Sequence, residues 1–276
     1  MKKTTLLIIT TICSSILQAQ NTNPIPCPTD KNNSKWSIGV QINTPERKIP
    51  NIEDKDQNAN VWEDGYLYNG DSHNGSTKDK TYAVSVVGNY YLKDNNFLRI
   101  KAGINNVDIV MTDKPFIDPT GTTLSYDNAW KKRMDFNVSP GIGYSIAIKH
   151  FNFYAGFELP YTHYGQAQFY AFWQNNDAKT GALISTEEMT GTIFKAYSIG
   201  IGNFIGFSFS FRSLSIGGEI TYAFLYKKLL SASTWHNLDK DFINNTTTSS
   251  DLTYNPTMSN FDMSKIKGSI MLTYSF

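Results

Sequence analysis

The chain has 276 residues and a formal net charge of +1 at pH 7, so it lacks the basic excess that nucleic-acid binding requires. Removal of residues 1–19, which contain Lys2 and Lys3 but no acid, leaves 23 basic against 24 acidic residues, a charge of −1. No run of eighteen apolar residues follows, which excludes an ordinary transmembrane helix. Aromatic residues make up 14% of the chain, an excess that aromatic girdles at two membrane interfaces would explain.

The first residues have the layout of a secretory signal peptide. Lys2 and Lys3 form a basic start, a short apolar stretch follows, and the small residue Ala19 precedes the expected cleavage point. The stretch is too short and too rich in Thr and Ser for a spanning helix. We therefore expect a signal peptide over 1–19, a flexible periplasmic lead over 20–33, and one folded domain over 34–276.

The two cysteines give little information about function. Cys13 lies in the predicted signal peptide, and Ile12 before it opposes the lipoprotein alternative, which requires a small residue at that position. The mature chain then retains Cys27 alone. Because one cysteine cannot form an internal disulfide, the sequence is not that of a disulfide-stapled secreted domain.

The strongest pattern is a period-two alternation between Met134 and Ile148. Even-numbered residues such as Phe136, Ile142 and Ile146 are apolar. The odd-numbered residues are small or polar, and one of them, Asp135, is charged. A helix would mix these two sets, but a strand separates them onto two faces. The pattern predicts a strand between lipid and a polar or tightly packed interior. Pro140 removes one backbone donor, so we expect a bulge or local distortion there.

Seven further runs alternate in the same way. They cover residues 36–43, 83–92, 98–105, 153–162, 197–210, 214–224 and 265–276. With the run from Met134 to Ile148 they make eight strands, an even number. Because backbone polar groups need partners in lipid, a spanning sheet has to close on itself. We therefore predict an all-β fold, a closed antiparallel eight-stranded transmembrane β-barrel whose interior is filled by side chains rather than forming a wide pore.

The connections between these runs alternate between long and short. Three are short, Lys93–Asn96, Lys149–Asn152 and Phe211–Ser213, and four are long, about Thr44–Lys80, Asp113–Lys131, Gln174–Thr190 and Lys228–Asn260. Membrane barrels have short periplasmic turns and long extracellular loops. An even strand number with both ends on the periplasmic side predicts this order, which a soluble sandwich would not need.

The last strand carries a recognisable ending. Ile270, Leu272, Tyr274 and the terminal Phe276 alternate and stop at an aromatic residue. This resembles the terminal strand that the barrel-assembly machinery reads in outer-membrane barrels. With the Ala19–Gln20 junction and the strand around Pro140, the chain over about 34–276 resembles small outer-membrane β-barrel domains of the Bacteroidota type. That resemblance implies location in the outer membrane of a Gram-negative bacterium, beside lipid and lipopolysaccharide, but no particular activity.

Charged residues on inward positions are the first candidates for a site. By the predicted register these are Arg99, Lys101, Glu158, Glu219, Lys265 and Lys267. Unpaired charges are costly in a narrow interior, so we expect ion pairs, and Glu219 and Lys267 lie at comparable depth on neighbouring strands. A structural network that plugs the interior is favoured over an ion path. A register slip of one residue would reverse every assignment.

The remaining chemistry is sparse. The four histidines, His73, His150, His163 and His236, have no metal-ligand spacing, so no metal and no cofactor is expected. No phosphate loop, dinucleotide glycine pattern or nucleophile elbow is present. Asp71, Ser72 and His73 in the first long connection, with His236, Asp239 and Asp241 in the fourth, are the weak basis for an enzyme alternative.

The long connections are the other place for function. The first contains Trp62, Tyr66 and Tyr68, and the fourth is rich in Asn, Thr and Ser around residues 244–250. Such residues suit contact with an extracellular protein or glycan. We expect a non-enzymatic barrel with a structural, adhesive or binding role. A small channel or an accessory barrel of a secretion system is the alternative, and a lipid-modifying or proteolytic enzyme the third.

Overall fold

The computed structural model describes residues 35–46, 76–92, 95–112, 115–118, 120–254, 259–264 and 266–276. The predicted signal peptide and lead, most of the first long connection and Lys265 lie outside these residues. Within them, no helix is long and apolar enough to cross a membrane.

The described residues form sixteen strands of one antiparallel sheet. The strands are β1 (Trp36–Asn43), β2 (Ser76–Asp79), β3 (Tyr82–Tyr91), β4 (Asn96–Thr112), β5 (Phe116–Ile117), β6 (Thr123–Ile148), β7 (Phe151–Glu158), β8 (Tyr161–Tyr164), β9 (Ala167–Asp177), β10 (Leu183–Ile193), β11 (Ala196–Phe211), β12 (Leu214–Leu229), β13 (Ser233–Asp241), β14 (Thr246–Tyr254), β15 (Ser259–Met263) and β16 (Lys267–Ser275). The prediction of an all-β fold is confirmed for this part of the chain.

Eight of these strands pair in a ring. β6 pairs with β7, and the pairing continues through β11, β12, β16, β1, β3 and β4. β4 then pairs with β6 over its whole length, from Asn96 opposite Tyr144 to Thr112 opposite Asn128. Each of the eight predicted runs supplies one strand of this ring. The first and last of them, β1 and β16, lie side by side, so the last part of the described chain returns to the first.

Short turns join the ring strands at one end. Lys149 and His150 separate β6 from β7, and Arg212 and Ser213 separate β11 from β12. Lys149 and Arg212 have φ values of 54° and 55°, and Asn95 before β4 has 65°. Tight antiparallel hairpins need this left-handed conformation, because its twist matches the twist of the paired strands. The three short connections therefore lie together at what we call the inner end of the ring.

The two faces of the ring differ as the alternation predicted. On β11, Ile201 and Ile205 are each 62% exposed, whereas Ser198 is 1% exposed. On β6, Ile142 is half exposed and Ser139 is buried. Large apolar side chains thus cover the outside, and small, polar and charged ones fill the inside. This is the reverse of a water-soluble domain, in which the exposed face is polar.

Two glycines make room for aromatic rings inside the ring. Gly143 on β6 lies opposite Phe97, and Gly206 on β11 lies opposite Tyr154. A Cβ atom on Gly143 would stand 2.3 Å from the Phe97 ring, and one on Gly206 would stand 2.3 Å from the Tyr154 ring. The absence of a side chain at these positions lets the rings lie flat against the wall.

A bulge or local distortion was expected at Pro140; the bulge is not present, but the partner strand is interrupted opposite this residue. β6 runs unbroken from Thr123 to Ile148, and Ile100 of β4 pairs with Pro140 without a register shift. The irregularity lies on the other side, where β7 ends at Glu158 and β8 starts at Tyr161. Pro160 stands in that gap, so two residues without an amide donor lie close together. The registers of β7 and β8 against β6 agree, and the ladder is interrupted rather than bulged.

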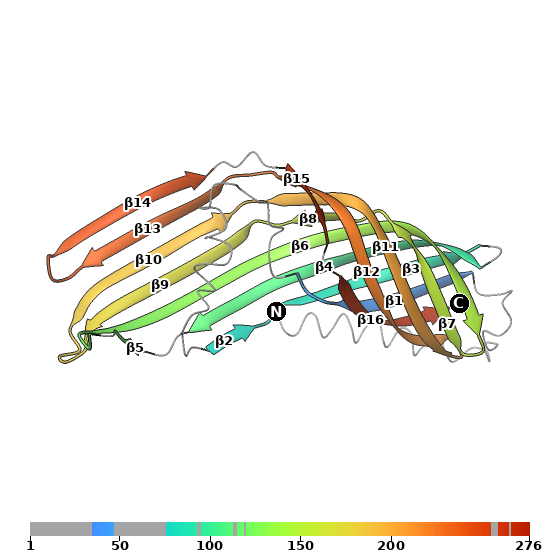
Figure 1. Cartoon of the computed structure of the whole chain (residues 1–276), viewed down its shortest axis with the longest axis horizontal. Helices are drawn as coiled ribbons and strands as arrows, with labels where there is room; N and C mark the ends of the chain where they lie inside the picture. The colour runs from blue at the N-terminus through green and yellow to red at the C-terminus, as the bar shows by residue number, and fades with distance from the viewer. Residues whose placement is uncertain are drawn as a thin grey trace.

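Three of the predicted long connections contain strands, a conformation that the sequence did not predict. The second contains β5 and the start of β6, the third is the β9–β10 hairpin, and the fourth contains the β13–β14 hairpin and β15. Strands β9, β10, β13 and β14 continue the sheet outward from β6 and form an extension beyond the outer end of the ring (Figure 1). The Asn, Gln and Thr content of these strands resembles the composition of loops.

Candidate functional site

A buried ion pair crosses the ring near its inner end. Arg99 of β4 donates from Nη1 to Oε2 of Glu219 on β12 over 2.6 Å, and from Nη2 to Oε1 over 2.8 Å. Nε2 of Gln41 donates to the same Oε1 over 3.0 Å. The Arg99 guanidinium also lies 4.3 Å from the centre of the Phe204 ring. Two-pronged contact with several supporting partners offsets the cost of burying both charges.

A second ion pair lies two residues further along β4, toward the outer end of the ring. Nζ of Lys101 is 3.3 Å from Oε1 of Glu158, and both side chains are largely buried. Within the described part of the chain, Oε2 of Glu158 has no hydrogen-bond partner. This pair and the Arg99–Glu219 pair are stacked along the ring interior, since Arg99 and Lys101 occupy successive inward positions of β4.

Apolar side chains close the inner end below these charges. The cluster consists of Val87, Phe97, Tyr154, Phe204 and Met271, all nearly or fully buried. The Phe97 ring centre lies 6.1 Å from that of Phe204 and 6.4 Å from that of Tyr154. We call this group the inner plug. It seals the end of the ring that carries the short turns.

A small cavity of about 100 Å³ lies above the Lys101–Glu158 pair. Its lining includes amide and hydroxyl side chains from residues such as Asn43, Ser85, Asn137, Ser139, Thr162 and Ser269, together with the charged side chains of Lys101 and Glu158. A space of this size and polarity suits several water molecules. The inner plug and the Arg99–Glu219 pair lie on the inner side of this cavity.

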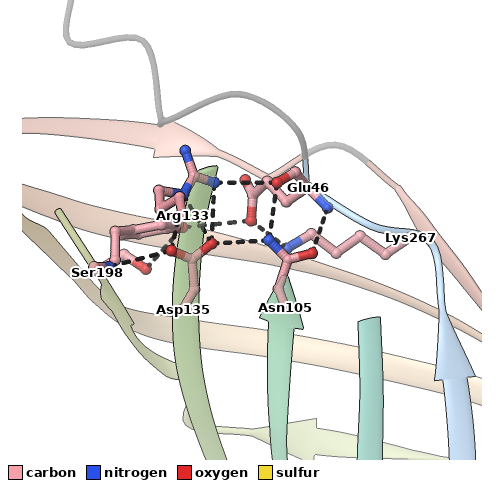
Figure 2. A network of polar contacts seen from close by, with 8 residues as sticks. Glu46, Asn105, Arg133, Asp135, Ser198 and Lys267 are labelled. Atoms are coloured by element: carbon pink, nitrogen blue, oxygen red, sulfur yellow. Dashed lines mark hydrogen bonds and ion pairs between the residues drawn. The ribbon is translucent and has the colours of Figure 1, made fainter. Parts of the chain in front are cut away.

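A polar network closes the outer end of the ring (Figure 2). Nε of Arg133 donates to Oδ1 of Asp135 over 2.8 Å, and Nη2 donates to the backbone oxygen of Glu46 over 3.1 Å. Nδ2 of Asn105 donates to Oδ2 of Asp135 over 2.8 Å and to the same backbone oxygen over 2.9 Å. Nζ of Lys267 lies 2.9 Å from Oε2 of Glu46. We call these five residues the outer cap.

Glu46 lies beyond the end of β1, outside the strand segments of the ring. Burial alone would raise the pKa of its carboxyl, but the ion pair and hydrogen bond with Lys267 outweigh burial, with help from Arg133 and Lys227. The pKa of Glu46 is therefore held below the ordinary value of 4.5. The carboxylate form is favoured, so the chain that leaves β1 is tied across the ring to β16 and β6.

The structure places the predicted inward charges as follows. Arg99, Lys101, Glu158 and Glu219 lie inside the ring, Lys267 lies at its outer end, and Lys265 is outside the described residues. The expectation that Glu219 and Lys267 would pair because of their similar depth is wrong. Glu219 faces Arg99 across the ring. This contact could be identified only once the pairing of all eight ring strands was known. Lys267 instead pairs with Glu46 from a connection.

Several interior residues were missed by the sequence. Glu46 lies in the first predicted connection, and Phe97 and Arg133 fall between a predicted connection and the run that follows it. Phe204 occupies an inward position of β11 at 0% exposure, between Gly202 and Gly206. Strict alternation already places Phe204 on the inner face, and that signal could have identified it.

The proposed catalytic grouping around His236 does not form. Nδ1 of His236 lies 2.7 Å from Oδ1 of Asp251 on the neighbouring strand, where both side chains are exposed. Asp239 and Asp241 occupy odd positions of β13 and so point to the opposite face of the sheet from His236. Asp71, Ser72 and His73 lie outside the described residues.

The other two described histidines, His150 and His163, lie at the borders of the ring. His150 is in an inner turn, with its ring 5.8 Å from that of Phe209, and His163 is on β8 opposite Phe136. The described part of the chain contains no group of three His, Cys, Asp or Glu side chains placed to hold a metal ion.

Comparison with known proteins gives distant likenesses only. No family model matches the chain, and no curated protein matches it in sequence. Among solved structures, the chain is similar to a major outer membrane protein from Thermus thermophilus, with 10% identity, 89% of this chain and all of that chain covered, and a TM-score of 0.28. It is also similar to the outer membrane protease OmpT from Escherichia coli, with 11% identity, 88% and 94% covered, and a TM-score of 0.25.

Both of these proteins are named as outer-membrane proteins. At such TM-scores the likeness decides neither strand number nor activity. Membership of a Bacteroidota-type barrel family stays a prediction.

Proposed function

We propose that the chain is an integral outer-membrane protein of a Gram-negative bacterium, in which the ring is a closed eight-stranded barrel that spans the membrane. The apolar outer face supports this, because only lipid favours such a surface over water. At about 3.4 Å per residue and a tilt of about 40°, β11 spans about 26 Å between Ile199 and Phe209. That height matches the roughly 25 Å apolar band of such barrels.

Aromatic side chains at both limits of this band support the same proposal. At the outer end, Tyr197 lies 6.3 Å from both Tyr161 and Tyr226. At the inner end, Trp36 lies 4.5 Å from Tyr90. Rings of this kind favour the interface between lipid headgroups and the apolar core. Lipid and lipopolysaccharide are then the first partners of the outer face.

The barrel acts, in this proposal, as a closed anchor that displays the extension for structural, adhesive or binding contact outside the cell. The observation that carries it is the filling of the interior. Among the described residues, the inner plug and the Arg99–Glu219 pair occupy the interior between the cavity and the inner end. This filling argues against the channel alternative.

Conductance of a planar lipid bilayer tests the closed interior. We expect no steady single-channel current from the reconstituted protein, whereas a general porin in the same bilayer gives one. Insertion is checked independently by a heat-dependent shift in gel mobility, which folded barrels show. A steady current from inserted protein would overturn the closed-anchor proposal and favour the channel.

We also propose that the chain acts without catalysis. An activity screen with lipid A and with peptides, repeated on His73→Ala and His236→Ala variants, tests this. Turnover that disappears in either variant would overturn the proposal.

A further inference from the structure

The outermost strand of the extension, β14, has one free edge. It pairs with β13 along its whole length, from Thr246 opposite Asp241 to Tyr254 opposite Ser233. In the part of the chain that the structure describes, no strand lies on its other side (Figure 1). The backbone groups along this edge of the nine-residue strand are unpaired, so another strand can form hydrogen bonds with them.

The hydrogen bonds show which residues of β14 face outward. The amide of Phe242, just after β13, donates to the backbone oxygen of Ile184 over 2.8 Å. Because backbone groups alternate between neighbours, even-numbered residues of β13 face β10 and odd-numbered ones face β14. Their partners on β14 are even-numbered. The odd-numbered residues of β14 therefore direct both backbone groups to the free edge: Thr247, Ser249, Asp251 and Thr253.

The free edge of β14 lacks the features that usually prevent an exposed edge strand from pairing with another strand. Natural edges carry Lys, Pro or bulges that block another strand. β14 contains neither Lys nor Pro, and its register against β13 is regular. Its single charge, Asp251, already contacts Nδ1 of His236 at 2.7 Å.

We propose that β14 pairs antiparallel with β14 of a second copy of this chain, about a two-fold axis at Ser250. In this register Thr247 lies opposite the partner's Thr253, and Ser249 opposite the partner's Asp251. All four outward residues of each copy then exchange backbone hydrogen bonds. Shifting the axis to Asp251 would place two carboxylates opposite each other, and shifting it to Ser249 would leave Thr253 unpaired. The register at Ser250 is the one that avoids both costs.

The pairing also fixes how two copies face each other. A two-fold axis between antiparallel strands of one continuous sheet stands normal to that sheet. The extension continues the barrel wall through β6, so this rotation reverses the direction of the barrel (Figure 1). The two barrels then point toward each other, as in two facing membranes. This step rests on the proposed membrane anchor and specifies its adhesive role.

Disulfide cross-linking tests the register. In a Cys27→Ser background, Ser250→Cys places two thiols at a non-hydrogen-bonded pair with Cα atoms about 4.5 Å apart, which suits a disulfide. Thr248→Cys is the matched control on the same face. Its counterparts would lie about 13 Å apart along the strand, beyond disulfide reach. We expect oxidised dimers in detergent from the first variant and at least tenfold less from the second. Equal yields, or none from Ser250→Cys, would overturn the pairing.

A proline tests the edge itself. Ser249→Pro removes an outward amide donor while leaving the bonds to β13, and Ser249→Ala keeps the donor. We expect the proline, combined with Ser250→Cys, to abolish the cross-link, and the alanine to leave it unchanged. An unchanged cross-link with proline would contradict strand pairing.

Two vesicle populations carrying differently labelled Ser250→Cys protein test the facing arrangement. We expect vesicle clustering and mixed-label dimers. Dimers that carry one label only would overturn the facing arrangement. Failure of the protein to insert, shown by the absence of heat-dependent mobility, would instead count against the membrane anchor.

Discussion

Arg99 and Glu219 reach each other from opposite sides of the strand ring, with side chains that are 2% and 0% exposed. Because β4 and β12 are not neighbours in the sheet, this contact ties the wall together across its interior. A carboxylate removed from such a site leaves a buried charge without its partner.

Glu219→Gln should therefore destabilise the folded protein by roughly 3–5 kcal/mol. Urea unfolding in detergent micelles, followed by tryptophan fluorescence, measures the change. The double variant Arg99→Met/Glu219→Met serves as the control, because it removes both charges and should recover most of the loss. A single variant as stable as the native chain would show that the contact contributes little.

Tyr154 and Gly206 provide a second test, of how the inner plug is packed. A side chain at Gly206 would collide with the Tyr154 ring, so Gly206→Leu should destabilise by about 1–3 kcal/mol, the usual cost of overpacking. Tyr154→Ala combined with Gly206→Leu gives the leucine room and should be more stable than Gly206→Leu alone. Additive losses in the unfolding midpoint would argue against direct contact between the two positions.

Period-two alternation made the faces of the ring predictable, because lipid imposes the same requirement on every strand. Ile142 and Ser139 are on the sides that their positions in the sequence required. The ion-pair partners across the ring could not be predicted from the sequence, because the depth of a residue along its strand does not show which strand lies on the opposite side of the ring. Lys267 shows this, because its carboxylate comes from Glu46 rather than from Glu219.

The extension was missed for a different reason. Strands such as β13, which contains His236, and β14, which contains Asp251, have few apolar residues, so their composition matches that of loops. Only their pairing identifies them as sheet. Two residues of the outer cap were missed for another reason, because Glu46 lies in a segment interpreted as a connection and Arg133 lies next to one.

The outer cap should respond to acid through Glu46. Its pKa is lowered in the folded state, so the contact with Lys267 adds stability above the ordinary carboxyl pKa of 4.5 and loses it as the pH falls through the lowered value. The melting temperature of the native chain should exceed that of Glu46→Gln at pH 7, and the gap should shrink below pH 4.5. Circular dichroism from pH 7 to 3 measures both. A gap that stays constant with pH would contradict the role of this ionisation.

A substitution at Phe276 tests whether recognition during assembly can be separated from the stability of the finished fold. Its ring is 58% exposed, and its backbone amide donates to the Trp36 oxygen over 3.0 Å. Replacement by alanine keeps that backbone bond, so Phe276→Ala should refold in detergent with a nearly unchanged unfolding midpoint. In cells, the same variant should reach the outer membrane at a clearly lower level, if the assembly machinery reads this aromatic end.

Tyr274 is the matched control: it is 9% exposed and its ring stacks 6.2 Å from that of Phe276. Tyr274→Ala should therefore lower the unfolding midpoint as well as the cellular level. Equal cellular levels of native chain and Phe276→Ala would remove the assembly role from the terminal residue.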